Sequence, residues 1–183
     1  MALPERVPGF VVEAGRAAGH DLPALDVRES LAPWREAIGG KGPFFVRIQA
    51  DDLAVIAQVR RISSVGELWL EAPLGSIDHA LDLLVAGAAR LVVPIAAEDS
   101  EMLEAIGPSA LVAWDGRSPW PAAQAAALEH GVPVLATHAP PDDAACDAFL
   151  IQADGRDLAL VRVASAPTPP DDAKSDDADG ETE

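Results

Sequence analysis

The sequence predicts an α/β fold: a shortened or incomplete (β/α) TIM-like barrel with parallel strands and a C-terminal hairpin. Three observations lead to this class. Apolar runs of strand length recur along the chain, helix signals lie between them, and the spacing of the two changes near the end. An open doubly wound sheet is the alternative, because it uses the same alternation of strand and helix.

Eight short runs rich in Val, Ile, Leu and Phe have the length of strands. Most are continuous rather than alternating, which is typical of strands covered on both faces, as in a parallel sheet under helices. These runs span residues 9–14, 44–49, 67–72, 90–95, 110–114, 132–137, 147–152 and 158–163.

Helix signals separate the runs in the middle of the chain. Ser76 can cap a helix that ends at Gly87, with one apolar face made of Ile77, Ala80, Leu81 and Leu84. The other expected helices are one opened by Asp51 and Asp52, one that Ser118 caps with Pro119 in its first turn, and residues 29–38 and 98–106. This order predicts right-handed βαβ units.

The last part of the chain departs from this order. The residues between Thr137 and Asp147 are fewer than the dozen or so that a crossover between parallel neighbours usually needs. Asp154 and Gly155 then form a hairpin signal between two apolar runs. The folded part, residues 1–163, is also shorter than the roughly 200–250 residues of a complete eightfold barrel.

Charge and composition narrow the classes of partner. The net charge of −17 argues against nucleic acid and anionic membrane, which both attract positive charge. Residues 164–183 are small, polar and acidic, and we expect a disordered tail there. The sequence has no apolar run of membrane-spanning length and no apolar signal region, so we expect a cytoplasmic protein. The one cysteine, Cys146, is expected to be a small buried apolar residue.

Three stretches resemble the histidine-biosynthesis barrels of the HisA/HisF family, which are an aminoaldose isomerase and the cyclase subunit of imidazole glycerol phosphate synthase. Residues 46–56 (VRIQADDLAVI) are similar to the second strand of that family. Residues 67–94 (ELWLEAPLGSIDHALDLLVAGAARLVVP) are similar to its third strand, the following helix and its fourth strand. Residues 110–116 (ALVAWDG) are similar to the fifth strand with its aspartate.

The resemblance implies a pair of carboxylates that act as general acid and base after the first and fifth strands. Asp115 matches the second of them, and Glu5 is the nearest carboxylate to the position of the first. His138, at the end of a predicted strand, is a further candidate base. Asp115 has an alternative role as the residue that caps an Asp-Gly turn.

The same comparison implies phosphate grips made of glycine N–H groups at strand ends and a helix N-terminus. Ser76 is retained, and Gly75 stands where the family has an arginine. Prolines, which have no N–H to donate, occupy other grip positions at Pro73 and Pro94. Thr137 and His138 stand where the family has a glycine-rich grip near its end. A bisphosphate site is therefore not expected.

Three hypotheses for function follow. The first is a divergent HisA/HisF relative that has lost the ancestral isomerase activity and acts as a binding or assembly protein. The second is an active isomerase or lyase on a small phosphorylated sugar, using Asp115 with Glu5 or His138. The third is a structural subunit completed by a partner chain. We expect no metal and no cofactor, and the expected partners are a small phosphorylated metabolite and a second copy or another chain.

Overall fold

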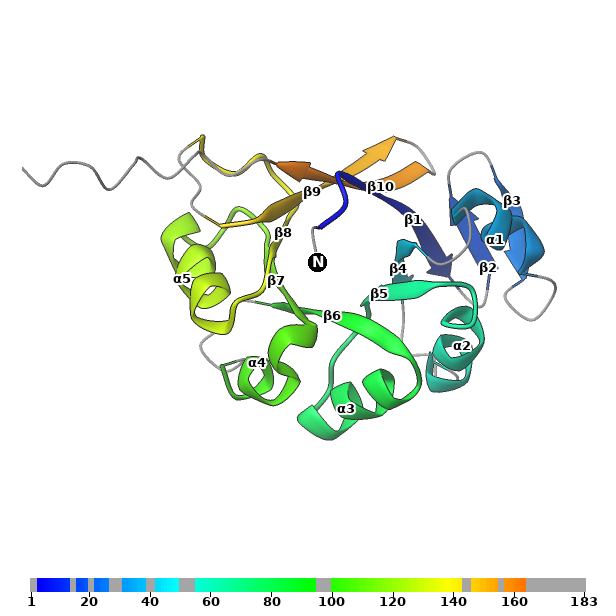
Figure 1. The fold of residues 1–183 in the computed structure, drawn as a ribbon, viewed down its shortest axis with the longest axis horizontal. Helices are drawn as coiled ribbons and strands as arrows, with labels where there is room; N and C mark the ends of the chain where they lie inside the picture. Colours follow the sequence, from blue (N-terminus) through cyan, green and yellow to red (C-terminus); the bar gives the residue numbers. More distant parts are fainter. Residues whose placement is uncertain are drawn as a thin grey trace, which may run out of the picture.

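The computed structural model describes residues 3–13, 16–19, 22–26, 31–38, 42–49, 55–94, 100–142, 146–154 and 157–163. Its strands form a ring with helices on the outside (Figure 1). The predicted class is confirmed: this is an incomplete TIM-like barrel, with a closed ring of eight strands among the described residues. The predicted tail, residues 164–183, lies outside them.

Seven of the eight barrel strands run parallel, in the same order as in the sequence. Each pairs with its neighbour, from Gly9 opposite Phe45 in the first pair to Val134 opposite Ala148 in the last, and the register shifts once, between Leu68 and Trp69 where β5 pairs with β6. The seven strands are β1 (Arg6–Glu13), β4 (Pro43–Gln49), β5 (Glu67–Glu71), β6 (Ala88–Pro94), β7 (Ala110–Trp114), β8 (Val134–Ala136) and β9 (Ala148–Asp154).

The eighth strand, β10 (Asp157–Val163), runs antiparallel to both of its neighbours. It follows β9 through the predicted hairpin, in which Asp154 and Asp157 are paired, and so short a connection can join only antiparallel strands. The other edge of β10 pairs with residues Arg6 to Gly9 of β1. This pairing closes the ring and excludes the open doubly wound sheet.

Two hydrophobic cores follow from the alternation of side chains along the strands. The barrel interior takes at least one fully buried or nearly buried residue from each of the eight strands: Val7, Phe45, Trp69, Val92, Leu111, Leu135, Phe149, Leu158 and Leu160. Trp69 is the largest of them, and its ring centroid lies 5.2 Å from that of Phe149 in an edge-to-face contact. The second core lies between the strands and the helices and holds Trp114 and Trp120.

Four helices cover the barrel between β4 and β8 (Figure 1). They are α2 (Val55–Ile62), α3 (Ile77–Val85), α4 (Ser100–Ile106) and α5 (Trp120–His130), and α1 (Ala32–Ile38) precedes β4. The opening residues predicted for α2, Asp51 and Asp52, lie outside the described residues. Within the part of the chain that is described, no helix follows β8 or β9, and none is long and apolar enough to cross a membrane.

Three local predictions were wrong. In α3 the predicted face is wrong at Leu81, which is 39 % exposed, and it omits the buried Leu83, whereas Ala80 is buried and Ile77 and Leu84 pack against the core as predicted. Ser118 does not cap α5. The N-cap is Pro119, and the Ser118 carbonyl instead accepts a hydrogen bond of 2.8 Å from the Trp114 indole.

The third error concerns the step from β8 to β9, which are parallel although the connection is short. β8 has only three residues, so the chain must return about 10 Å to start the next strand. The connection from Thr137 to Asp147 can cover that distance without a helix.

Two strands outside the ring were not predicted. β2 (Arg16–Gly19) and β3 (Leu22–Asp26) form an antiparallel extension of β1. They are poor in large apolar residues, which removes the signal that marked the barrel strands. β1 therefore has two parts on one edge: Arg6 to Gly9 close the barrel with β10, and Phe10 to Glu13 pair with β2.

Candidate functional site at the carboxyl end of the barrel

The carboxyl ends of the parallel strands surround a hollow that we call the mouth. A cavity of about 210 Å³ lies there, and a second one of about 550 Å³ adjoins it. Both are lined by Glu71, Val92, Pro94 and Ala113. In barrels of this class, ligands bind at this end, because the loops that follow the strands are free to vary there. The smaller cavity lies below, and the larger one within, the roughly 300–1,000 Å³ typical of drug-sized ligands.

Arg47 and Glu71 form an ion pair in the wall of the larger cavity. The Arg47 Nε donates to the Glu71 Oε2 at 2.8 Å, and the two residues are direct neighbours in the register of β4 and β5. Both side chains are partly buried. The pair neutralises an arginine that could otherwise hold an anion at the mouth.

Asp115 follows β7 and lines the smaller cavity together with Ser118 and Thr137. Its Oδ1 accepts the backbone N–H of Arg117 at 2.9 Å, and the Arg117 guanidinium lies 3.7 Å from its Oδ2. The pKa of Asp115 lies below its ordinary 3.8, chiefly because of that backbone hydrogen bond, and the Arg117 charge adds to it. Asp115 therefore has a turn-capping contact and a carboxylate in the mouth at the same time.

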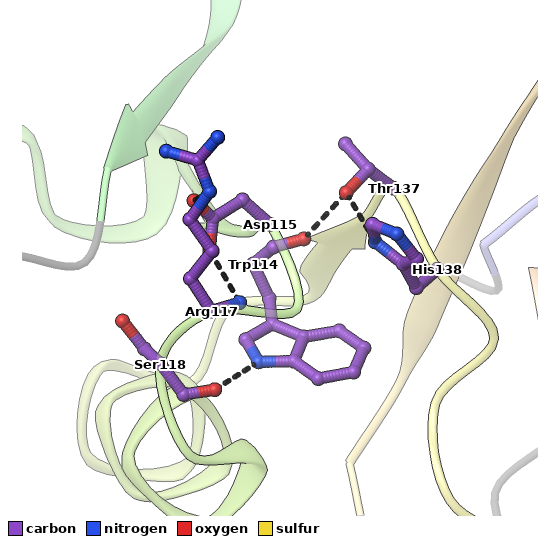
Figure 2. A network of polar contacts seen from close by, with 6 residues as sticks. All are labelled: Trp114, Asp115, Arg117, Ser118, Thr137 and His138. Atoms are coloured by element: carbon purple, nitrogen blue, oxygen red, sulfur yellow. Dashed lines mark hydrogen bonds and ion pairs between the residues drawn. The ribbon is translucent and has the colours of Figure 1, made fainter.

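His138 and Thr137 extend this network from the end of β8 (Figure 2). The Thr137 hydroxyl lies 3.4 Å from the Trp114 carbonyl, to which it donates, and 3.0 Å from the His138 Nδ1. When the hydroxyl proton points to the carbonyl, Nδ1 is the donor, and Nε2 is then the acceptor of the neutral ring. Asp115 and His138 thus lie at the ends of neighbouring strands, with Thr137 between them in this view.

Gly116 makes room for the histidine. Its φ of +78° is in the left-handed region, and a Cβ there would lie 2.8 Å from the His138 Nδ1. Both facts favour glycine after Asp115. The Asp-Gly pair therefore shapes the turn and also admits the His138 ring.

Glu5 lies at the opposite end of the barrel from Asp115. It precedes β1, whereas Asp115 follows β7, and the two strands point the same way. The Glu5 carbonyl accepts the N–H of Arg162, and the Arg162 side chain contacts the Leu3 carbonyl and the Asp147 carboxylate. The structure therefore does not bring Glu5 and Asp115 together as an acid/base pair.

Ser76 caps its own helix, as predicted: its hydroxyl accepts the N–H of His79 at 3.2 Å. Gly75 is exposed, and a Cβ added to it would meet nothing within 4 Å. Pro73 and Leu74 line the larger cavity, and Pro94 lines both. Prolines therefore stand at the mouth at the ends of two neighbouring strands, and neither has an N–H for a phosphate.

Glu71 and Arg47 are charged residues of the mouth that the sequence patterns did not single out. Both lie inside predicted strands, and a signal for Glu71 was present. Glu67, Trp69 and Glu71 alternate with apolar residues, and Trp69 points into the barrel. Residues two apart on a strand share a face, so Glu71 had to point inward as well.

The described residues contain no group of three or more His, Cys, Asp or Glu side chains placed to hold a metal ion. Cys146 is buried in the outer core, as predicted. Burial raises the pKa of its thiol, and the neighbouring Asp147 charge adds to this rise. The cysteine is thus an apolar packing residue rather than a reactive one.

The sequence matches no protein-family model, and it matches none of the curated proteins with which it was compared. The fold is therefore assigned from the closed barrel itself.

Proposed function

We propose that this protein is a divergent relative of the HisA/HisF barrels that binds a small polar metabolite at the mouth and does not carry out the ancestral isomerase reaction. The observation that carries the proposal is the composition of the mouth. A cavity lined by Asp115, Ser118 and Thr137 is present, while the strand ends beside it carry Pro73 and Pro94. Binding needs only the first feature, and gripping a phosphorylated substrate needs donors that prolines lack.

The separation of the two candidate acid/base carboxylates supports the same proposal. The ancestral reaction uses two carboxylates on opposite sides of a bound sugar. Here Glu5 lies at the far end of the barrel, so Asp115 has no partner from β1 that the sequence comparison suggested.

An enzyme on a small sugar-like substrate is the second candidate, and one observation favours it. Glu71 and Asp115 line the same cavity, so two carboxylates share the mouth even though Glu5 does not reach it. The third candidate, a subunit whose barrel a partner completes, has less support, since β10 already pairs with β1 and closes the ring.

The test is ligand mapping by NMR on the full chain, with a set of small neutral, cationic and phosphorylated metabolites. We expect binding to shift the amide signals of Ala113, Asp115 and Thr137. Ala113→Phe should fill the cavity and abolish binding, because Ala113 lines both cavities. Ala125→Phe, on the exposed side of α5, is the matched control and should leave binding unchanged.

Two results would count against the proposal. Turnover of an aminoaldose ribotide that is lost in Asp115→Asn would establish the enzyme instead. Binding that survives Ala113→Phe would place the ligand elsewhere on the molecule.

A further inference from the structure

The two carboxylates of the mouth differ in what holds them. Glu71 is committed to Arg47 through Oε2. Asp115 accepts a backbone N–H, and its only ionic contact in the described structure is Arg117 at 3.7 Å, whose side chain is 91 % exposed. A charge so exposed is hydrated and mobile, and such a pair contributes little. The Asp115 carboxylate therefore keeps most of its charge available to a ligand.

The positive charge of the described cavity lining is already neutralised by an ion pair. Among the described lining residues of the two cavities, Arg47 is the only cation, and Glu71 neutralises it. With Arg47 at +1 and Glu71 and Asp115 at −1 each, the formal charge of this lining is −1. The whole chain carries −17, so the surrounding field has the same sign.

The neutral polar groups of the mouth can also accept hydrogen bonds from a ligand. Ser118 and Thr137 offer hydroxyl oxygens that can accept hydrogen bonds beside Asp115. The strand ends at Pro73 and Pro94 offer no N–H for an anion. The remaining wall is apolar, with Val92, Leu135 and Ile151 below the polar rim.

We propose that the ligand of the mouth is a small organic cation with a protonated amine, which Asp115 binds with help from the Thr137 and Ser118 oxygens. This inference rests on the proposed binding function. It reverses the charge preference that the family resemblance implies, because an anion in the cavity would meet Asp115, and Arg47, the one cation of the described lining, is already paired with Glu71. An ammonium group, in contrast, carries three donors and fits a wall of acceptors.

The experiment compares probes that differ in charge and little else, by calorimetry on the full chain. One set is glucose, glucosamine and glucose 6-phosphate, and a second is 1,4-butanediol and putrescine. We expect an amine to bind on the order of tenfold or more tightly than its alcohol, with no binding of the phosphate ester. Higher salt should weaken the binding, as for any partly exposed charge pair.

Variants tie the preference to the mouth. Asp115→Asn keeps an oxygen that can accept the Arg117 N–H, so the turn is retained, and it should remove the preference for the amine. Asp82→Asn removes the same charge from the exposed side of α3 and is the matched control. It should leave the preference intact.

The outcomes of these binding experiments separate the cation inference from the proposed binding function. Equal affinity for amine and alcohol, tighter binding of the phosphate, or no amine binding at all would overturn the cation inference. If a neutral or anionic probe binds and Ala113→Phe abolishes that binding, the proposed binding function stands without the inference. If no probe of any charge shifts the mouth amides, the binding function falls with it.

Discussion

Arg47 and Glu71 are paired residues of neighbouring parallel strands, and their side chains form an ion pair of 2.8 Å at the mouth of the barrel. This contact neutralises the arginine that lines the larger cavity. It also leaves Asp115 as the carboxylate of the described lining without a close ion-pair partner. The charge preference of the mouth therefore depends on Glu71 although the proposed ligand contact is Asp115.

Glu71→Gln should release Arg47 and weaken that preference. With Arg47 free, the formal charge of the described lining changes from −1 to 0, and inorganic phosphate should begin to bind at millimolar concentration. Loss of the partly exposed ion pair should lower the free energy of unfolding by about 1 kcal/mol, which corresponds to a fall of roughly 2–4 °C in Tm. Calorimetry and thermal unfolding measure the two effects. The role given to Glu71 is wrong if phosphate binding does not appear in a variant that remains folded.

Gly116→Ala should displace the His138 ring. The new Cβ would lie 2.8 Å from Nδ1, and the residue would also be strained at φ +78°. Gly131→Ala is the matched control, since its φ is +64° and nothing lies within 4 Å of the added Cβ. It should cost about 1–2 kcal/mol from backbone strain alone.

NMR of the His138 ring distinguishes the two variants. We expect its signals to shift in Gly116→Ala, because the hydrogen bond to Thr137 is lost, and to stay unchanged in Gly131→Ala. Adding His138→Ala to Gly116→Ala should bring the stability loss to that of the control. Unchanged ring signals in Gly116→Ala would contradict the close contact.

Trp69→Ala should be the most damaging single change in the barrel interior. Trp69 is 1 % exposed, packs on Phe149, donates to Glu67 at 2.9 Å and lies under the Arg90 guanidinium at 5.4 Å. We expect a loss of about 3–5 kcal/mol in urea unfolding. Trp69→Phe should lose less, and it remains measurable if the alanine variant does not fold.

The control for this change is Leu81→Ala on the exposed side of α3, which should alter stability by less than about 0.5 kcal/mol. Equal effects of the two alanine variants would mean that the barrel interior is not the main core.

The Asp115 carboxyl should titrate below pH 3.8. Its pKa is lowered in the folded state, so the stability that it contributes is present above 3.8 and is lost as the pH falls through the lower folded value. Carbon NMR of the carboxyl group measures this directly. In Arg117→Ala the pKa should stay below 3.8, because the backbone N–H, which is the larger cause, remains. A midpoint at or above 3.8 in the unaltered protein would contradict this hydrogen bond.

Much of the fold could be predicted from local patterns. All eight apolar runs became barrel strands, because a strand buried on both faces must be apolar throughout. The hairpin at Asp154 was predictable because a two-residue connection leaves one choice of direction. The residues of the site were harder to predict from local patterns. Asp115 was found because it follows a strand, whereas Glu71 lies inside one and was treated as part of a buried run.

The sequence by itself thus determined which segments form the eight barrel strands, the acidic charge and the prolines at the strand ends. Only the tertiary structure decided that β10 closes on β1, that β8 and β9 are parallel, and that Glu5 and Asp115 lie at opposite ends. The reason is physical. Hydrophobic periodicity is a property of residues that are close together in the sequence. The pairing of the first strand with the last depends on contacts between residues distant in the chain, and so does the set of side chains that the closed ring brings to the mouth.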